Sequence, residues 1–326
     1  MNTVSMPWLE RAYAQAIIAL DGERLPHALL VGGPAGLGKR ELARRLAHRL
    51  LCSTPRAGAA CGQCRNCKLL AAGNHPDFIE VTFELNEKRE LRKEILIAQV
   101  RSLTERLALT PHIAPAQVAL IHPAEAMNRS AFNALLKTLE EPLPRRHLIL
   151  VADQPQRLPA TIRSRCQWLR LGLPPQDEAL AWLLASGHEG SSAGQALDAA
   201  QGNPGLARDY LLDGGLALRH AVANDLATLA QGHQAAVDVA IAWNQDRPEQ
   251  RLRFAGELVR DHLARRAGTD HADLLSGAGV RARADPLALA AWFDASVRTV
   301  RSLDGPLQAH LQIAELLLDW RALAAA

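Results

Sequence analysis

A glycine-rich segment near the start of the chain has the spacing of a phosphate-binding loop. Gly33, Gly36, Gly38 and Lys39 fit the pattern GxxxxGK, between an apolar run and an amphipathic helical pattern. Glycines let backbone N–H groups converge on phosphate oxygens, and the lysine and the helix N-terminus add positive charge. The segment therefore indicates a nucleotide-binding ancestry. A glycine-rich turn without chemical function is the alternative.

The positions that would hold a magnesium ion lack suitable side chains. The residue after the lysine, Ser or Thr in an active loop, is Arg40, and a guanidinium cannot ligate a cation. The apolar run 118–121 ends in His122-Pro123, where an acidic pair is needed, and Glu125 is a weak substitute. We therefore predict negligible ATP hydrolysis by this chain, with weak or absent ATP binding through the glycines and the lysine.

Four of the five cysteines lie close together, at Cys52, Cys61, Cys64 and Cys67, while Cys166 lies far away. Four thiolates complete the ligand set of a closed tetrahedral zinc site, which leaves no open position for catalysis. The spacing predicts a structural Zn²⁺ that stabilises an insertion between a helix and a strand. An iron–sulfur cluster and buried free thiols are the alternatives.

Apolar runs alternate with helical patterns over the first half of the chain, and beyond residue 171 only helical patterns follow. Strands alternating with helices predict an α/β domain, a mostly parallel sheet with helices on both faces. After it, short helices are predicted over 176–212 and a helical bundle beyond Asp213-Gly214-Gly215. The predicted strands are 28–31, 78–81, 118–121, 147–152 and 168–171, and the clearest predicted helices include 39–51, 100–107 and 132–139.

Composition limits the function classes. The 326 residues are 48% hydrophobic and 22% charged, which excludes a disordered chain. No stretch is long and apolar enough for a membrane span and the start lacks a signal-peptide pattern, so we expect a soluble, cytoplasmic protein without a membrane partner. A net charge of +3 and 4% aromatic residues give little basis for direct nucleic-acid binding by this chain.

Two arginines follow the fourth predicted strand, in Arg163-Ser164-Arg165-Cys166, after a short helical pattern that begins near Leu158-Pro159. On composition alone they are solvated surface charges. The motifs taken together, however, resemble the clamp-loader branch of the AAA+ proteins. The phosphate loop, the four cysteines, the run FNALLKTLEEP at 132–142 and the Ser-Arg-Cys motif carry the resemblance, which extends to about residue 210.

The resemblance implies a three-part subunit: an AAA+ nucleotide-binding domain of RecA-like type at 1–171 with a zinc module at 52–67, a small helical lid at 172–212, and an all-α collar at 213–326 that joins subunits into a ring. It also implies that Arg165 is an arginine finger, which stabilises charge on the nucleotide of a neighbouring subunit. Motor subunits of this branch keep the magnesium-binding residues. Because this chain has lost them, it resembles a subunit that acts as a stator.

The resemblance further implies a role in loading a sliding clamp during DNA replication, as part of a DNA polymerase holoenzyme. The implied partners are motor subunits and a delta-type subunit in a heteropentameric ring, which also brings the sliding clamp and primed DNA. Gly205 stands where motor subunits carry an arginine, and we do not expect Arg208 to replace it. The alternatives are an active motor ATPase of the same loader and a zinc-dependent DNA-binding regulator.

Overall fold

The computed structural model describes residues 5–22, 24–86, 88–269, 274–275, 285–303, 305 and 308–325. The chain divides into two compact units, Met1–His188 with Gly202–Leu206, and Glu189–Gln201 with Ala207–Ala326. This division runs through the predicted lid, because its first helix groups with the sheet. The predicted three-part organisation stays a prediction.

The first unit is built around a five-stranded sheet with the order β2-β3-β4-β1-β5. Every neighbouring pair is parallel; Leu30 of the central β1, for example, aligns with Leu150 of β4 and Trp168 of β5. The sequence prediction of a parallel α/β sheet is confirmed, with each strand within one residue of its expected bounds. The strands are β1 (Ala28–Gly32), β2 (Phe78–Val81), β3 (Gln117–Ile121), β4 (Arg146–Ala152) and β5 (Gln167–Arg170).

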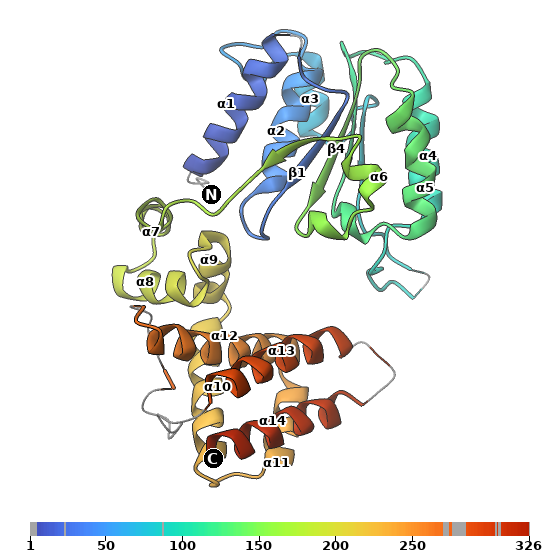
Figure 1. The fold of residues 1–326 in the computed structure, drawn as a ribbon. Coiled ribbons are helices and arrows are strands. Elements are labelled where there is room, and N and C mark those ends of the chain that lie inside the picture. The colour runs from blue at the N-terminus through green and yellow to red at the C-terminus, as the bar shows by residue number, and fades with distance from the viewer. Residues whose placement is uncertain are drawn as a thin grey trace. The chain divides into compact units, whose positions relative to one another are not determined.

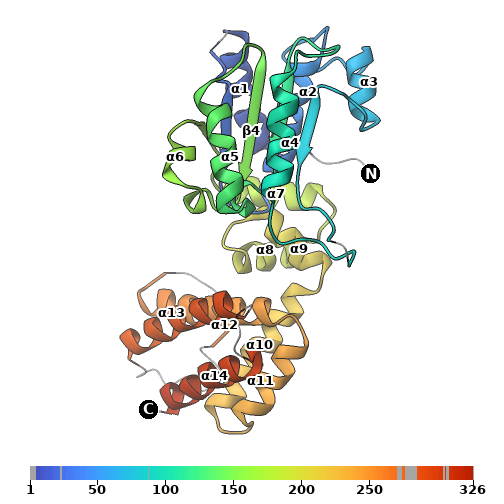
Figure 2. The same ribbon diagram turned by 90° about the vertical axis from the view of Figure 1, so that its right-hand side faces the viewer.

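Helices cover both faces of this sheet, which is why β1 and β3 are buried along their whole length. Figure 1 shows α1, α2 and α3 on one side of the strands and α4, α5 and α6 on the other, and Figure 2 shows α4 and α5 side by side. The helices of this unit are α1 (Pro7–Asp21), α2 (Lys39–Leu51), α3 (Arg65–Ala71), α4 (Ile97–Ala108), α5 (Arg129–Glu140), α6 (Ala160–Arg163) and α7 (Gln176–Ala185), with single 3₁₀ turns η1 (Ala124–Ala126) and η2 (Pro155–Arg157).

A buried carboxylate, Asp77, fastens the segment that leads into β3. It is fully buried just before β2, and its two oxygens accept the backbone N–H groups of His112, Ile113 and Ala114 at 2.6–2.9 Å. Burial alone would raise the pKa of Asp77, but the three donated hydrogen bonds outweigh it and lower the pKa. The ionised carboxylate thus replaces the backbone partners that a loop cannot provide for itself.

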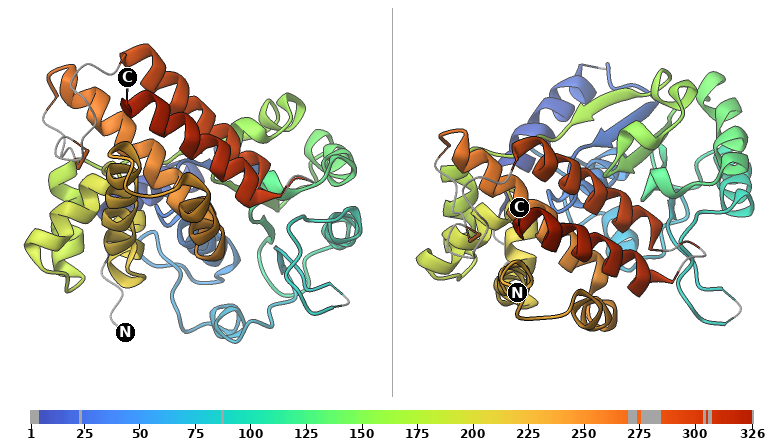
Figure 3. Two further views of the ribbon diagram at one scale, coloured as in Figure 1. Left: turned by 90° about the horizontal axis from the view of Figure 1, so that it is seen from below. Right: turned by 60° about the horizontal axis from the view of Figure 1, so that its bottom comes forward.

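The second unit is helical. Its core contains three tryptophans whose indole N–H groups all find partners: Trp243 donates to Asp225, Trp320 to the Leu226 carbonyl and Trp292 to the Leu316 carbonyl, each at 2.8 Å. Figure 3 shows α13 and α14 running side by side. Helix α9 begins in the first unit and continues into this one. The helices are α8 (Gly190–Ala199), α9 (Pro204–Leu212), α10 (Gly215–Ala230), α11 (Ala236–Gln245), α12 (Pro248–Arg266), α13 (Pro286–Ser302) and α14 (Ala309–Ala325).

In the part of the chain that the structure describes, none of these helices combines the length and the apolar character that crossing a membrane requires.

Candidate functional site

The predicted phosphate loop joins the end of β1 to the start of α2, as the sequence indicated. Gly36 and Gly38 adopt left-handed backbone conformations with φ of 81° and 79°, which glycine tolerates at no steric cost. A Cβ on Gly38 would lie 2.8 Å from Leu9 Cδ1 of α1. The loop therefore requires glycine at both positions and is packed tightly against the N-terminal helix.

Lys39, the cation of the loop, is already neutralised within the chain. Its side chain is 3% exposed, and Nζ lies 2.6 Å from Oδ1 of Asp153, the first residue after β4. Nζ also donates to the carbonyl oxygen of Pro34 in the loop itself. A phosphate would have to displace an internal carboxylate to pair with this ammonium.

Arg40, in the magnesium-binding position, points to β2. Its Nη2 lies 2.9 Å from Oε1 of Glu80, and Nη2 of Arg44 lies 2.9 Å from the other oxygen of the same carboxylate. Burial opposes ionisation of Glu80, but the hydrogen bonds and charges of the two arginines outweigh it and lower its pKa. The position thus contributes an ion-pair cluster on the surface of α2 and offers no oxygen ligand for a metal.

Glu125, considered as a substitute for the missing acidic pair, lies in η1 and holds a turn. Its Oε1 accepts the backbone N–H groups of Asp153 and Gln154 at 2.8 and 2.9 Å. His122 at the end of β3 has a pKa lowered first by burial and then by the charge of Arg40, so its imidazole is neutral at pH 7. Neither side chain forms the acidic pair that an active site of this type uses.

Residues at the start of α9 lie directly on the phosphate loop. Asn203 Nδ2 donates to the Ala35 carbonyl at 2.8 Å, and Asn203 Oδ1 accepts the N–H of Leu206 at 3.1 Å. A Cβ built on Gly205 would lie 1.9 Å from the carbonyl oxygen of Gly36, so no side chain fits there. The sequence singled out Gly205 as a departure from the motor subunits but missed Asn203, whose only signal is its position before a proline at a helix start.

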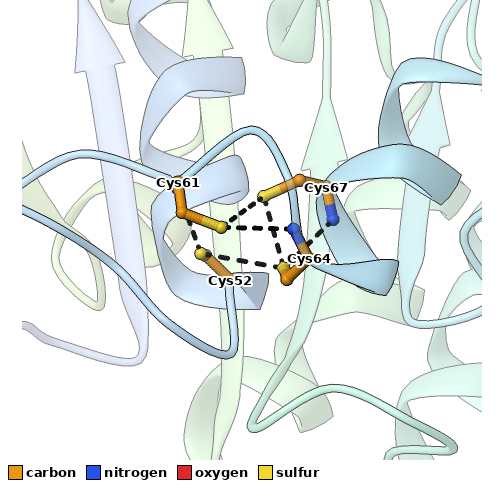
Figure 4. Close-up of side chains that lie close together, drawn as sticks. All are labelled: Cys52, Cys61, Cys64 and Cys67. Carbon is orange, nitrogen blue, oxygen red and sulfur yellow. Dashed lines mark hydrogen bonds between the residues drawn. The ribbon is translucent and has the colours of Figure 1, made fainter.

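The four clustered cysteines converge as predicted, between the end of α2 and the first turn of α3 (Figure 4). Their sulfur atoms all lie within 4.8 Å of one another. The shortest sulfur–sulfur distances are 3.5 Å between Cys64 and Cys67 and 3.9 Å for the pairs Cys52–Cys64 and Cys61–Cys67. Tetrahedral zinc with Zn–S bonds of about 2.3 Å places its sulfurs about 3.8 Å apart, so the donor set fits a zinc ion.

Donors around Cys61 favour its thiolate, whereas burial raises the pKa of Cys67 to about 12. The Cys61 sulfur accepts from the Thr54 hydroxyl and from the Cys64 N–H, both at 3.3 Å. The Thr54 hydrogen bond is the largest cause that lowers the pKa of Cys61, to about 5. The buried Asn66 side chain donates to the Leu51 carbonyl at 2.9 Å and thereby ties α3 to the end of α2. These hydrogen bonds therefore hold the four sulfur atoms close together between α2 and α3.

Arg165 lies elsewhere in the first unit, on the turn between α6 and β5. Its side chain is 36% exposed, Nη2 lies 2.6 Å from Oε1 of Glu140 at the end of α5, and Nη1 donates to the Thr161 carbonyl at 2.9 Å. The neighbouring Arg163 differs, because its backbone carbonyl accepts from Trp168 and its Nε is buried. Of the two arginines in the motif, Arg165 presents its guanidinium at the surface.

The glycine-rich loop between a central parallel strand and a helix, with helical segments following the sheet, defines an α/β domain of the AAA+ class. Residues 9–174 match the family model described as DNA polymerase III, delta subunit. The chain belongs to the family of DNA polymerase III subunit delta'.

Two relatives illustrate this membership, and a third shows a shorter similarity to another subunit. The chain is 40% identical over 241 residues to DNA polymerase III subunit delta' of Pseudomonas aeruginosa, covering 73% of this chain and 71% of the relative. It is 32% identical over 267 residues to subunit delta' of Escherichia coli, covering 80% and 77%. It is also 38% identical over 159 residues to subunit tau/gamma of Haemophilus influenzae, but this match covers 49% of this chain and 22% of the relative.

Proposed function

We propose that this chain is a clamp-loader subunit of DNA polymerase III that is silent toward its own nucleotide and supplies Arg165 to the active site of an adjacent motor subunit. The match to delta' relatives over most of their length supports the clamp-loader role, and a shorter match to a tau/gamma relative supports motor subunits as partners. Through the complex, the chain acts in clamp loading during DNA replication.

The contacts of the phosphate loop support the proposal that this chain does not hydrolyse ATP itself. Lys39 pairs with Asp153, Arg40 pairs with Glu80, and the carbonyl of Gly36 lies against Gly205. Phosphoryl transfer depends on cations and a metal placed around the phosphates. Here Lys39 and Arg40 are paired with carboxylates of the same chain, and an arginine occupies the position of the magnesium-binding residue. The loop therefore has a structural role within the domain.

Arg165 has the properties that a trans-acting cation needs. Arginine keeps its charge at every physiological pH and presents planar donors that match phosphate oxygens. Its guanidinium is partly exposed, and its counterion Glu140 has a side chain 48% exposed. A surface pair of this kind leaves other donors of the guanidinium unused, so a phosphate can join the carboxylate at small cost.

Nucleotide titration of the purified chain tests whether it binds and hydrolyses ATP. We expect calorimetry with ATP and Mg²⁺ to show no binding at micromolar concentrations, and an ATPase assay to show no turnover. The alternative, an active motor subunit, requires both binding and turnover that Lys39→Met abolishes. That result would contradict the stator assignment.

Reconstitution tests the role of Arg165. A loader in which only the motor site next to this chain is active should lose ATP turnover on the order of 10³-fold with Arg165→Ala, the lower end of the effect of arginine fingers in other nucleotide hydrolases. Arg165→Lys should restore little, because an ammonium lacks the planar donors. Arg163→Lys is the matched control. Turnover unchanged by Arg165→Ala would remove the finger from the proposal.

We also propose that Cys52, Cys61, Cys64 and Cys67 hold a structural Zn²⁺, supported by sulfur–sulfur distances that match a tetrahedral site. Elemental analysis should find one zinc per chain, reduced by Cys64→Ser and unchanged by Cys166→Ala. Stoichiometric iron with visible absorbance would instead indicate an iron–sulfur cluster, and no metal would reject the site.

The third candidate function is a zinc-dependent DNA-binding regulator. A net charge of +3 gives it little support. A DNA-binding titration at several salt concentrations should show no measurable binding by the isolated chain. Tight, strongly salt-dependent binding would favour the regulator.

A further inference from the structure

Arg165 is held at two points by its own domain. Nη2 lies 2.6 Å from Oε1 of Glu140, and Nη1 donates to the carbonyl oxygen of Thr161 at 2.9 Å. The two anchors come from different elements, the C-terminal end of α5 and the short helix α6, which pack against each other. The end of the side chain is therefore fixed relative to the domain.

The anchored guanidinium retains donors for a ligand. Arginine carries five N–H donors in a planar fork, and the two anchors engage one on each terminal nitrogen. The side chain is 36% exposed, so a ligand can approach it from outside. An arginine without anchors would have to lose its rotamer freedom at the moment of binding.

The position of Glu140 gives a second, independent argument. It is the last residue of α5, where the helix dipole places partial negative charge. A carboxylate is disfavoured there, and the last turn of the helix contains one basic residue, Lys137. The cation that compensates it in the structure is Arg165, so the charge at position 140 is suited to holding this arginine.

We propose that Glu140 is a positioning residue for Arg165: its carboxylate, together with the Thr161 carbonyl, holds the guanidinium in the orientation in which its free donors meet the phosphate of the neighbouring subunit. This inference rests on the proposed function of Arg165. Glu140 itself does not touch the nucleotide. It lowers the ordering cost of the arginine and thereby acts on turnover and not on ATP affinity.

The test uses the complete loader with one active motor site, next to this chain. Glu140→Ala should lower kcat for ATP roughly threefold to tenfold, the range expected when one long side chain must be ordered, with KM for ATP unchanged. Glu140→Gln should recover part of the loss, because its amide oxygen still accepts from Arg165. Glu141→Ala, at the adjacent exposed carboxylate, is the matched control and should leave kcat unchanged.

The same substitutions in an Arg165→Ala loader separate the two levels of the proposal. If Arg165→Ala alone leaves kcat unchanged, the proposed role of Arg165 as a finger fails. If Arg165→Ala lowers kcat but Glu140→Ala leaves it unchanged or raises it, the finger stands and the positioning role is overturned. A loss from Glu140→Ala that persists in the Arg165→Ala loader also overturns it, since the effect then bypasses the arginine. Thermal unfolding of each isolated variant checks that the domain is folded.

Discussion

The phosphate loop and the Arg165 turn both present a cation, yet they use it in opposite ways. At the loop, Lys39 is 3% exposed and paired with Asp153, and the start of α9 packs onto the backbone. At the turn, Arg165 and Glu140 are both partly exposed. A buried, neutralised charge stabilises the domain that contains it, whereas a half-exposed charge can accept a further partner from outside. Under the proposed function, the loop has a structural role and the turn a chemical one.

The largest expected effect is a difference in stability between variants of Lys39 and of Arg165. Lys39→Met keeps most of the buried stem but removes the ammonium, so Asp153 and the Pro34 carbonyl lose their partner. We expect the free energy of unfolding to fall by about 2 kcal/mol, less than for a fully buried pair because Asp153 is partly exposed. Arg165→Ala should cost less than about 1 kcal/mol. Urea unfolding of both variants measures this.

The two substitutions should rank in the reverse order for ATP turnover by the loader. Arg165→Ala should abolish most turnover at the adjacent site, and Lys39→Met should leave it within about twofold of the wild type once the protein is saturating. If Lys39→Met lowered turnover as strongly as Arg165→Ala while the chain stayed folded, the loop would be a working nucleotide site and the contrast between the regions would disappear.

A smaller effect concerns the joint between α9 and the loop. Gly205→Ala places a Cβ 1.9 Å from the Gly36 carbonyl oxygen, so the start of α9 must move away from the loop. We expect a loss of about 1–2 kcal/mol in the free energy of unfolding. Gly194→Ala in α8 is the control, because nothing lies within 4 Å of its Cβ and alanine favours a helix. Equal effects at both positions would contradict the tight joint.

Much of the fold could be predicted from the sequence because its elements are encoded locally. Strands such as β1 and β3 are short apolar runs, and α2 repeats its apolar residues every four positions. The cysteine cluster was also predictable, since four cysteines within one short segment match the number of ligands in a tetrahedral metal site. These signals require no knowledge of which distant segments meet.

The neutralisation of the loop could not be predicted, because it depends on distant partners. Lys39 meets Asp153 only when β1 and β4 pair, and Asn203 reaches Ala35 across 168 positions of sequence. Local sequence shows that Arg40 cannot bind magnesium, but it does not show that Glu80 will pair with it. The sequence thus predicted what the loop lacks, and the structure was needed to show what replaced it.

The smallest expected effect is a pH dependence of the free energy of unfolding, which arises from Glu80 and its two arginine partners. The pKa of Glu80 is lowered in the folded state, against the opposing effect of burial, by the hydrogen bonds and charges of Arg44 and Arg40. A carboxyl whose folded pKa lies below its unfolded value of about 4.3 contributes stability above that pH, and the contribution is lost as the pH falls through the folded pKa.

Glu80→Gln should therefore lower the free energy of unfolding by about 1 kcal/mol at pH 7, where Glu80 pairs with two partly exposed arginines. The difference from the wild type should shrink below about pH 4, because the wild-type carboxyl is then increasingly protonated as well. Urea unfolding at pH 7, 5 and 3.5 measures both curves. Glu141→Gln, an exposed carboxyl at the end of α5, should run parallel to the wild type over the same range. A Glu80→Gln curve that is also parallel to the wild type would show that Arg40 and Arg44 do not depend on this carboxylate, and would contradict the assignment of the arginine in the magnesium position to a structural ion pair.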